Sequence, residues 1–334
     1  MNRLLASFSL AAAAVLALPA PAQDRITATH VFPKNFVYAQ SFLEFVRKAN
    51  AAGKGVFEIS VRGGPEAIPM MEQANAARNG VVDMVYSPCS FYAATVPECD
   101  AVVASSIDGP RARKSGAYEA FNQAHRSRMG VQYLGWFDSG IQFHLWSTKE
   151  FKFDPKGDLD IRGFKVRGNP IYNAFLTNHL GAQVITLNSP EMYTALERGT
   201  VDISPWTSIG VMDSQWDKYL KYRLDPGFFS TDLGVIVNLQ KWNALGAKTR
   251  EILNRVSIEH ERASLRTLGE LRKKEFAELE RRGVKAQAMP PAAGKRFVEA
   301  ARKYNYQRMK ERLDKLPNGP ASYGRFVKLF GPGA

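Results

Sequence analysis

The 334-residue sequence lacks the short motifs that usually mark catalytic, nucleotide and metal sites. HExxH, CxxC, GxSxG, Walker and GxGxxG patterns are all absent, and there is no calcium loop rich in Asp and Asn. The five histidines and two cysteines are scattered, without the spacing of metal ligands. These absences argue against an enzyme, and they predict a protein with no catalytic residue, no metal and no cofactor.

The sequence also lacks the clustered basic residues of a nucleic-acid-binding protein. Lys and Arg number 45 against 32 Asp and Glu, for a net charge of +13, but the basic residues are spread along the chain. No basic tail and no basic-aromatic cluster is present, so we expect no nucleic acid partner. The positive balance favours anionic partners in general and says nothing about the fold.

Long hydrophobic runs are missing except at the N-terminus. There, MNR is followed by the apolar run LLASFSLAAAAVLAL and by the small residues of PAPAQ. This pattern predicts a signal peptide over residues 1–22, with cleavage after Ala22. A membrane anchor is the alternative, but the run is on the short side for crossing a bilayer. We therefore expect an exported, soluble, periplasmic protein.

Cysteine is scarce in a chain that we expect to be exported. Cys89 and Cys99 lie ten positions apart and are the only two. They could form a disulfide in an oxidising compartment, or they could be two buried thiols. The sequence leaves both alternatives open.

Strands and helices alternate along the chain, which predicts an α/β architecture. The segment EISVRGGPE…AARNGVVDM also matches VITLNSPE…ALERGTVDI, so that Pro65–Glu66 corresponds to Pro190–Glu191. In the same way Gly80–Asp83 corresponds to Gly199–Asp202. A chance match is one interpretation. We favour two similar lobes with a ligand cleft between them, because open α/β sheets bind ligands at the carboxyl ends of their strands.

Residues 242–282 have a strongly helical pattern that ends at Gly283. An unbroken helix of this length would extend about 60 Å and could brace both lobes. The alternative is two helices with a break near Gly269. A further helical segment follows, and the Pro- and Gly-rich end after Leu316 predicts a loosely held tail.

Arg167 ends the short alternating strand FKVR, just before a helix start at Asn169. Asn169 suits the N-cap, and Pro170 suits the first helical position. An anion at this place would meet a guanidinium and the N–H groups of a helix N-terminus. Position alone is equally compatible with a surface arginine.

The segment from Asp160 to Asp202 resembles the extracytoplasmic solute receptors of tripartite ATP-independent periplasmic (TRAP) transporters. The family pattern of a DLKGLKIR-type strand, LGA and E-x-Y-x-AL-x-x-G-x-VD is matched by Asp160, Gly163, Lys165, Arg167, Gly181, Glu191, Tyr193, Ala195, Leu196, Gly199, Val201 and Asp202. The resemblance continues through DKYLKYRLDPGFFSTDLGVIVNLQKW and the long helix. It implies an organic-acid ligand whose carboxylate pairs with Arg167.

The resemblance further implies a type II-like, two-lobed periplasmic-binding-protein fold of the Venus flytrap kind. A long helix would span both lobes, and the ligand cleft would lie between them. We expect residues 23–142 and about 232–275 in lobe I, and 143–231 and about 276–334 in lobe II.

The sequence departs from the family at two places. Where many members have a ligand-binding Asn, VDISPWTS places Trp206, and the second arginine of some members is replaced by a segment with Gln142 and His144. The resemblance then implies a ligand with one carboxylate and a partly apolar body, such as a keto, hydroxy or aromatic acid. Trp206 and Phe229 could instead be core residues.

In the first lobe, loops at the carboxyl ends of strands offer further candidates. The complete set of predicted ligand-binding residues is Arg167, Trp206, Asn169, Gln142, His144, Tyr92, Phe36, Glu66, Ser90 and Phe229. Glu66 would repel a carboxylate, so we expect it to accept a hydrogen bond from a hydroxyl or to face solvent.

These observations predict a monomeric periplasmic receptor that captures a monocarboxylate and delivers it to the membrane subunits of a TRAP permease. Two alternatives remain. One is a receptor that reports its ligand to a signalling partner. The other is a secreted α/β enzyme, which would need a nucleophile–base pair or a metal site that the sequence does not show.

Overall fold

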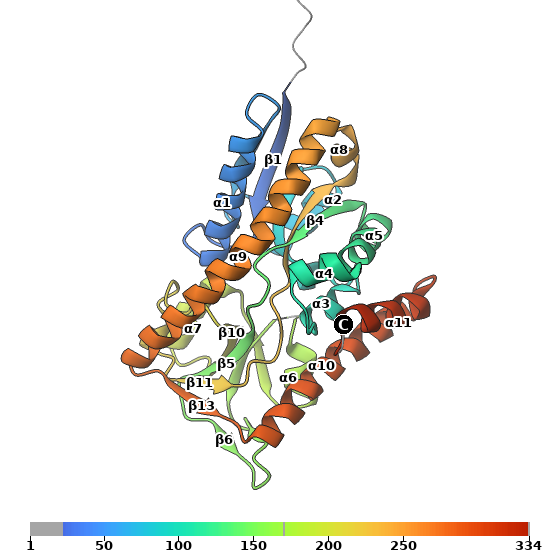
Figure 1. The fold of residues 1–334 in the computed structure, drawn as a ribbon. Helices are drawn as coiled ribbons and strands as arrows, with labels where there is room; N and C mark the ends of the chain where they lie inside the picture. Colours follow the sequence, from blue (N-terminus) through green and yellow to red (C-terminus); the bar gives the residue numbers. More distant parts are fainter. Residues whose placement is uncertain (1–22, 170, 333–334) are drawn as a thin grey trace, which may run out of the picture.

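The computed structural model describes residues 23–169 and 171–332 (Figure 1). The expected signal peptide, residues 1–22, lies outside the described residues. None of the helices in the described ranges is both long and apolar enough to cross a membrane.

The first lobe is built on a five-stranded sheet. Its strand order is β2 (Phe57–Gly63), β1 (Asp24–His30), β3 (Met84–Pro88), β12 (Leu233–Asn238) and β4 (Val131–Trp136). β1 pairs in parallel with β2 and β3, whereas β12 is antiparallel to β3 and β4. The other elements of this lobe are α1 (Val37–Ala52), α2 (Gln73–Arg78), η1 (Cys89–Tyr92), α3 (Cys99–Val103), α4 (Gly109–Ser115), α5 (Ala117–Met129) and α8 (Leu239–Ala244).

The second lobe is built on a six-stranded sheet. Its strand order is β13 (Lys285–Ala288), β11 (Tyr222–Asp225), β5 (Phe143–Ser147), β10 (Ile203–Thr207), β8 (Lys165–Gly168) and β9 (Gln183–Thr186). It also contains α6 (Asn173–Asn178), η2 (Ser189–Glu191), α7 (Met192–Glu197), η3 (Trp216–Lys218) and the ribbon of β6 (Lys152–Phe153) and β7 (Leu159–Asp160). The chain passes between the sheets at 137–142 and returns at 226–232. The predicted two-lobed α/β architecture is confirmed.

The internal repeat has a structural counterpart in both lobes. Gly80 and Gly199 have φ angles of 73° and 61°, a left-handed conformation that glycine adopts readily. Three residues later, an Asp Oδ2 accepts a backbone N–H of the neighbouring strand: Asp83 from Thr27 at 2.8 Å, and Asp202 from Lys165 at 3.0 Å. The repeated residues therefore close the same kind of turn against each sheet.

The sequence PEAIPMMEQANAARNG predicts a helix that starts at Pro65 and ends before Gly80, but the helix in the structure is shorter, because α2 begins only at Gln73. The preceding residues form turns in which the Gly64 N–H donates to Glu66 Oε1 at 2.6 Å. Pro69 contributes to this difference, since its ring disfavours a helical conformation in the residue before it.

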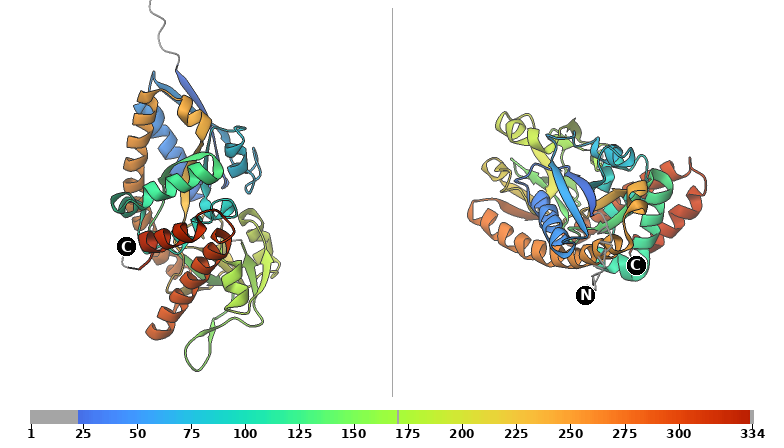
Figure 2. Two further views of the ribbon diagram at one scale, coloured as in Figure 1. Left: turned by 90° about the vertical axis from the view of Figure 1, so that its right-hand side faces the viewer. Right: turned by 90° about the horizontal axis from the view of Figure 1, so that it is seen from above.

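The long helix α9 (Ala247–Arg281) is unbroken over 35 residues and passes through Gly269. Figures 1 and 2 show it lying along the outside of both lobes. Two buried glutamates attach it: Glu261 accepts the Trp136 N–H at 2.7 Å in the first lobe, and Glu275 accepts the Gly210 N–H at 2.9 Å in the second. Burial raises the pKa of both carboxyls. The predicted brace is confirmed, and a break at Gly269 is not present.

The C-terminal segment differs from its prediction. α10 (Pro291–Leu313) packs on α6 of the second lobe and on α3 of the first, and α11 (Gly319–Phe330) packs on α3, α4 and α5. Phe326 and Phe330 are buried and stack with ring centroids 5.7 Å apart. Because this apolar face is buried against first-lobe helices, the segment after Leu316 is an ordered helix and not a loose tail. It packs on lobe I although the sequence placed it in lobe II.

The two cysteines are free thiols, and both are buried. Burial raises the pKa of Cys89 well above its usual value and that of Cys99 to about 12.

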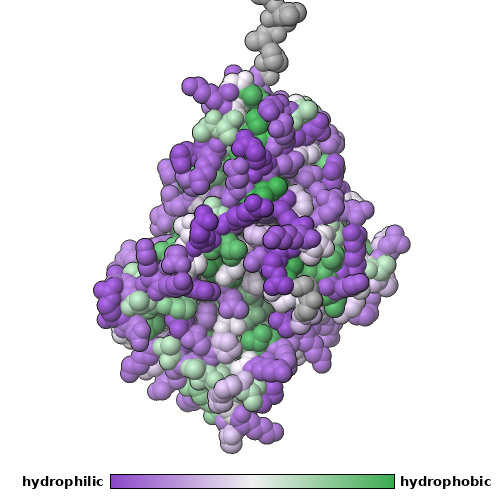
Figure 3. Space-filling view, in the orientation of Figure 1, coloured by the Kyte–Doolittle hydropathy of each residue, from purple (hydrophilic) through white to green (hydrophobic). Residues whose placement is uncertain are grey.

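The face of the molecule in Figure 3 is mostly hydrophilic with small hydrophobic areas. The charged outer side of α9 accounts for part of that surface.

Candidate ligand-binding site

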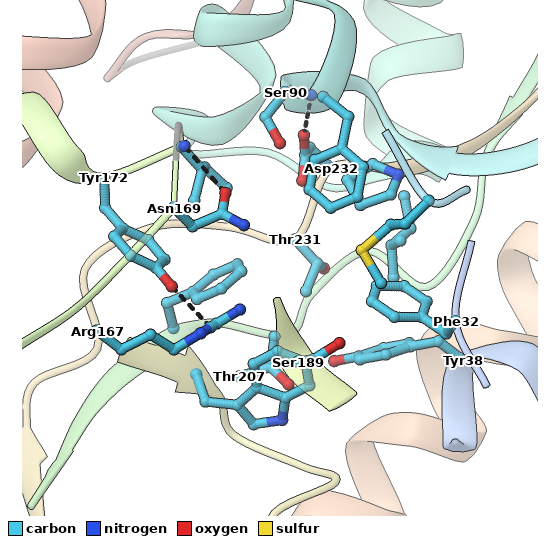
Figure 4. A pocket seen from close by; sticks show the side chains of 17 residues that line it. Phe32, Tyr38, Ser90, Arg167, Asn169, Tyr172, Ser189, Thr207, Thr231 and Asp232 are labelled. Atoms are coloured by element: carbon cyan, nitrogen blue, oxygen red, sulfur yellow. Dashed lines mark hydrogen bonds between the residues drawn. The ribbon is translucent and has the colours of Figure 1, made fainter. Parts of the chain in front are cut away.

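A pocket lies between the two sheets and is lined by residues of both lobes (Figure 4). Strands β3, β8 and β10 end at it, and residues at or just after their carboxyl ends form much of its wall. This is where open α/β sheets bind ligands. The lining side chains leave about 500 Å³ of space, part of it open to solvent.

Arg167 projects into this pocket from the end of β8 and is only 3% exposed. Its Nε donates to the Leu187 carbonyl at 3.1 Å, and its Nη1 donates to Tyr172 Oη at 2.7 Å and to the Pro205 carbonyl at 3.3 Å. All three acceptors are uncharged. Within the described residues no carboxylate lies at ion-pair distance from this guanidinium. A buried guanidinium without a charged partner favours the binding of an anion.

Two hydroxyl groups without partners lie in the same pocket. Tyr38 enters it from α1 in the first lobe, and Ser189 enters it from η2 in the second. Among the described residues neither the buried Tyr38 Oη nor the buried Ser189 Oγ has a partner at hydrogen-bond geometry, although the Thr207 side chain lies close to the Tyr38 hydroxyl. Buried polar atoms are normally paired, so unpaired hydroxyls in a pocket indicate a ligand that would accept from them. Figure 4 shows Tyr38, Ser189 and Thr207 grouped on one side of the pocket.

Trp206 supplies an aromatic wall next to Arg167. The centre of the guanidinium lies 5.4 Å from the centroid of the indole ring, within the range of a cation–π contact. Phe32 and Trp216 meet the same ring edge-on, at centroid distances of 6.5 and 4.8 Å. The indole therefore positions the guanidinium and also belongs to the aromatic core, so the two roles proposed from the sequence are not exclusive.

A second charged group, Asp232, lies on another side of the pocket. It is 2% exposed, and its Oδ2 accepts the Ser90 N–H at 2.6 Å. Burial raises the pKa of this carboxyl to about 6. Ser90 Oγ is buried on the same side, next to this carboxylate, and Asn169 completes the side, with its Oδ1 accepting the Ile171 N–H at 3.2 Å. The pocket therefore presents donors around Arg167 and an acceptor at Asp232.

Four of the ten residues predicted from the sequence line this pocket: Arg167, Asn169, Ser90 and Trp206. Phe36 lies just behind the lining, where its ring meets Trp206 edge-on at 6.2 Å and stacks on Phe32. It supports the aromatic wall without lining the cavity.

Three second-lobe candidates lie elsewhere. His144 is buried with Nδ1 3.0 Å from the Leu224 carbonyl oxygen and 3.0 Å from an Asp225 carboxylate oxygen. Gln142 is exposed and pairs through its backbone with Ser230. Phe229 is 1% exposed and packs within the second-lobe core, which agrees with the alternative that it is a core residue.

Two first-lobe candidates also lie outside the lining. Tyr92 is buried in the first-lobe core, with its Oη 3.2 Å from His125 Nε2. Glu66 is exposed and accepts the Gly64 N–H, which agrees with the expectation that it faces solvent. In η1 the chain turns tightly, so that Ser90 faces the pocket whereas Tyr92, two residues later, faces the core.

Sequence reasoning missed Asp232, Tyr38, Tyr172 and Ser189. Asp232 precedes the amino end of β12, and only because β12 is antiparallel to β3 does this end meet the carboxyl end of β3, with Leu233 opposite Pro88. A search of strand carboxyl ends therefore passes over it. Tyr38 has the spacing of a core position on an amphipathic helix, which carries no sign of a ligand contact.

No three His, Cys, Asp or Glu side chains of residues 23–169 and 171–332 are grouped so as to hold a metal ion.

The family whose model matches this chain is described as bacterial extracellular solute-binding protein, family 7, and the match covers residues 28–312. A monocarboxylate 2-oxoacid-binding periplasmic protein from Nostoc sp. is 25% identical over 217 residues, which are 61% of this chain and 57% of that protein. The chain thus matches little more than half the length of this curated relative.

Solved structures of similar fold cover nearly the whole chain. A Bordetella pertussis extracytoplasmic solute receptor binding pyroglutamic acid has a TM-score of 0.74 at 18% identity, covering 91% of this chain and 99% of that one. A TRAP transporter solute-binding protein from Bordetella bronchiseptica, with calcium and picolinate in its site, has a TM-score of 0.75 at 19% identity, covering 92% of each chain. At these identities the likeness shows the fold alone.

Proposed function

The chain belongs to family 7 of the bacterial extracellular solute-binding proteins, the TRAP solute receptors, and we propose that it captures a small monocarboxylate and delivers it to a TRAP permease. Proteins of this family are solute receptors and not enzymes, as the absence of catalytic motifs predicted. The periplasm is the proposed site of action, reached through the predicted signal peptide.

The observation that carries this proposal is the buried guanidinium of Arg167. It is 3% exposed, it faces a pocket between two lobes, and its partners are two carbonyl oxygens and a phenol. A carboxylate would supply the missing charge and could accept hydrogen bonds from Nη2, the nitrogen of the guanidinium that has no bond to the described residues. The unpaired hydroxyls of Tyr38 and Ser189 would donate to the same carboxylate from opposite lobes.

The names of the similar proteins support this ligand class. They are described as binding a 2-oxoacid, pyroglutamic acid and picolinate, each of which carries one carboxylate. We propose a keto, hydroxy, heterocyclic or aromatic acid for this chain as well. Phe32, Phe143 and Trp206 would pack against the apolar part of such a molecule.

Ligand-dependent closure is proposed to occur about the two crossings at 137–142 and 226–232, with α9 attached to both lobes. The proposed lobes are residues 23–142 with about 232–275, and 143–231 with about 276–334, except that α11 packs on the first lobe. A receptor of this kind needs only to close on its ligand and to present the closed shape to a membrane partner.

Arg167→Ala tests the proposal. Purified wild-type protein should bind at least one monocarboxylate from an organic-acid panel and gain thermal stability with ligand concentration. The variant should lose at least about 30-fold in affinity, because removing one partner of a buried charge pair costs about 2 kcal/mol or more. Isothermal titration calorimetry measures this loss.

Arg162→Ala is the matched control, since Arg162 belongs to the same segment, has an 80% exposed side chain and, among the described residues, forms its ion pair with Asp160. It should bind as the wild type does. Unchanged affinity in Arg167→Ala, with the protein folded, would refute the assignment.

Delivery is tested by uptake in cells that carry the permease membrane subunits with and without this receptor.

A further inference from the structure

The pocket contains a second buried charge that the proposed carboxylate does not satisfy. Asp232 is 2% exposed. The Ser90 N–H donates to its carboxylate at 2.6 Å, and hydrogen bonds from the Ser90 hydroxyl and from the Asp232 N–H also lower its pKa against the effect of burial. Within the described residues no lysine, arginine or histidine lies at ion-pair distance from it. Arg167 and Asp232 therefore carry opposite charges in one pocket, and each lacks a charged partner.

The two charges lie on different sides of the cavity and do not neutralise each other. Figure 4 shows the Asp232 carboxylate beside Ser90 and the Arg167 guanidinium beside Tyr172, with Thr231 between them. Arg167 donates to uncharged oxygens only and forms no ion pair with Asp232. Buried charges in proteins are normally paired or hydrogen-bonded at most of their positions. A ligand that spans the cavity would satisfy both groups at once.

A donor on the ligand fits the surroundings of Asp232 better than a metal ion does. Metal ions in proteins are usually held by several side chains, and no three His, Cys, Asp or Glu of the described residues are grouped so as to hold one. The polar groups on this side of the pocket are the backbone N–H and the hydroxyl of Ser90 and the side chain of Asn169, and none of them carries a charge. With a pKa raised to about 6, the carboxyl is mostly ionised at neutral pH and accepts hydrogen bonds.

We infer that the ligand is a carboxylic acid that also carries an N–H donor, whose carboxylate meets Arg167 while the N–H group meets Asp232. This inference rests on the proposed function and narrows it to amino acids, lactam acids and similar nitrogen-bearing acids. An acid whose other end is only a keto or ether oxygen would direct a lone pair at a buried carboxylate. Asp232 thereby acts as a specificity residue, because a polar group left unpaired on binding rejects an otherwise similar ligand.

Matched pairs of ligands test the inference on the wild-type protein. Pyroglutamate is compared with its lactone counterpart, 5-oxotetrahydrofuran-2-carboxylate, and proline with tetrahydrofuran-2-carboxylate. In each pair an N–H group is replaced by an oxygen while ring size and carboxylate are retained. At least one nitrogen-bearing member should bind about tenfold to a hundredfold more tightly than its oxygen counterpart, the range for a hydrogen bond to a charged group. Equal or reversed affinities would overturn the inference.

Asp232→Asn tests the residue itself. The asparagine oxygen can still accept the Ser90 N–H, so the local structure can be retained, and the thermal midpoint reports folding. The preference for the nitrogen-bearing member should fall by about tenfold, because an amide accepts an N–H less strongly than a carboxylate does. Asp83→Asn, the same change at a carboxylate outside the pocket, should keep the preference.

The outcomes separate this inference from the proposed function. If Arg167→Ala abolishes binding of both members of a pair and Asp232→Asn leaves their ratio unchanged, the receptor assignment stands and the inference fails. If chelation with EDTA removes binding, Asp232 acts through a cation and the inference also fails. If no acid binds and Arg167→Ala changes nothing, the proposed function itself fails.

Discussion

Arg167 depends on Tyr172 for its orientation. Tyr172 is 1% exposed, its Oη accepts from Arg167 Nη1 at 2.7 Å, and the same hydroxyl lies 3.4 Å from the Pro205 carbonyl. The guanidinium thus donates one hydrogen bond from Nη1 to the tyrosine hydroxyl and one from Nε to the Leu187 carbonyl. These bonds hold the planar group in one orientation. Only Nη2 has no bond to the protein among the hydrogen bonds described above.

Tyr172→Phe should lower the affinity for a carboxylate ligand by about fivefold to tenfold, because one hydrogen bond to a charged donor is lost while the ring stays in place. Calorimetric titration measures the change. Tyr133→Phe is the matched control, since Tyr133 Oη is buried without a partner in the first-lobe core. That variant should bind normally, and a similar loss in both variants would show that the effect is not specific to the pocket.

At the scale of elements, α9 is a polar helix that is held by both lobes and not by its own propensity. Helices of its composition gain most of their stability from tertiary contacts. Gly269 lies in the helix interior and has a low helix propensity, and no atom lies within 4 Å of a Cβ added there. Gly283, just past the helix end, has a φ of 87° that disfavours any side chain.

Gly269→Ala and Gly283→Ala should therefore shift stability in opposite directions. The first should raise the free energy of unfolding by about 0.5–1 kcal/mol, and the second should lower it by about 1 kcal/mol or more. Urea denaturation followed by circular dichroism measures both. Since the chemical change is the same, each variant is the control for the other, and a shift of the same sign in both would contradict this account of the helix and its end.

At the scale of the whole molecule, buried histidines couple stability to pH. His260 on α9 is 3% exposed, with Nε2 3.1 Å from Ser41 Oγ and Nδ1 unpaired, and it packs against Phe45 and Phe137. Burial lowers its pKa to about 4, and burial lowers the pKa of His125 to about 4 as well. The unfolded chain takes up these protons near pH 6.5, so the stability that the neutral rings contribute above that pH is lost as the pH falls toward 4.

His260→Phe removes one of these protonation sites while keeping an aromatic ring. Between pH 7.5 and pH 4.5 the free energy of unfolding should fall by about 2 kcal/mol less in the variant than in the wild type. Denaturant titrations at the two pH values measure the difference. His179→Gln should change the pH dependence less than His260→Phe does, because His179 is exposed and burial lowers its pKa to a smaller extent. Parallel pH profiles for wild type and His260→Phe would contradict the prediction.

The candidate site was predictable where a local pattern carried the information. Arg167 ends an alternating strand, and Asn169 follows it, so both were expected at the mouth of a cleft, and both line the pocket. His144 lies on the same sheet, but its imidazole is occupied by Leu224 and Asp225, partners that are distant in the sequence. A local sequence pattern does not predict contacts between residues that are so far apart in the chain.

The sequence by itself determined the two α/β lobes, the long helix and the arginine at the end of β8, because hydrophobic period, turn residues and caps act over a few neighbouring positions. Only the tertiary structure decided that Asp232 shares a pocket with Arg167, and that α11 packs on the first lobe. The physical reason is that an antiparallel pairing and a helix docked across lobes depend on which distant apolar faces are buried together.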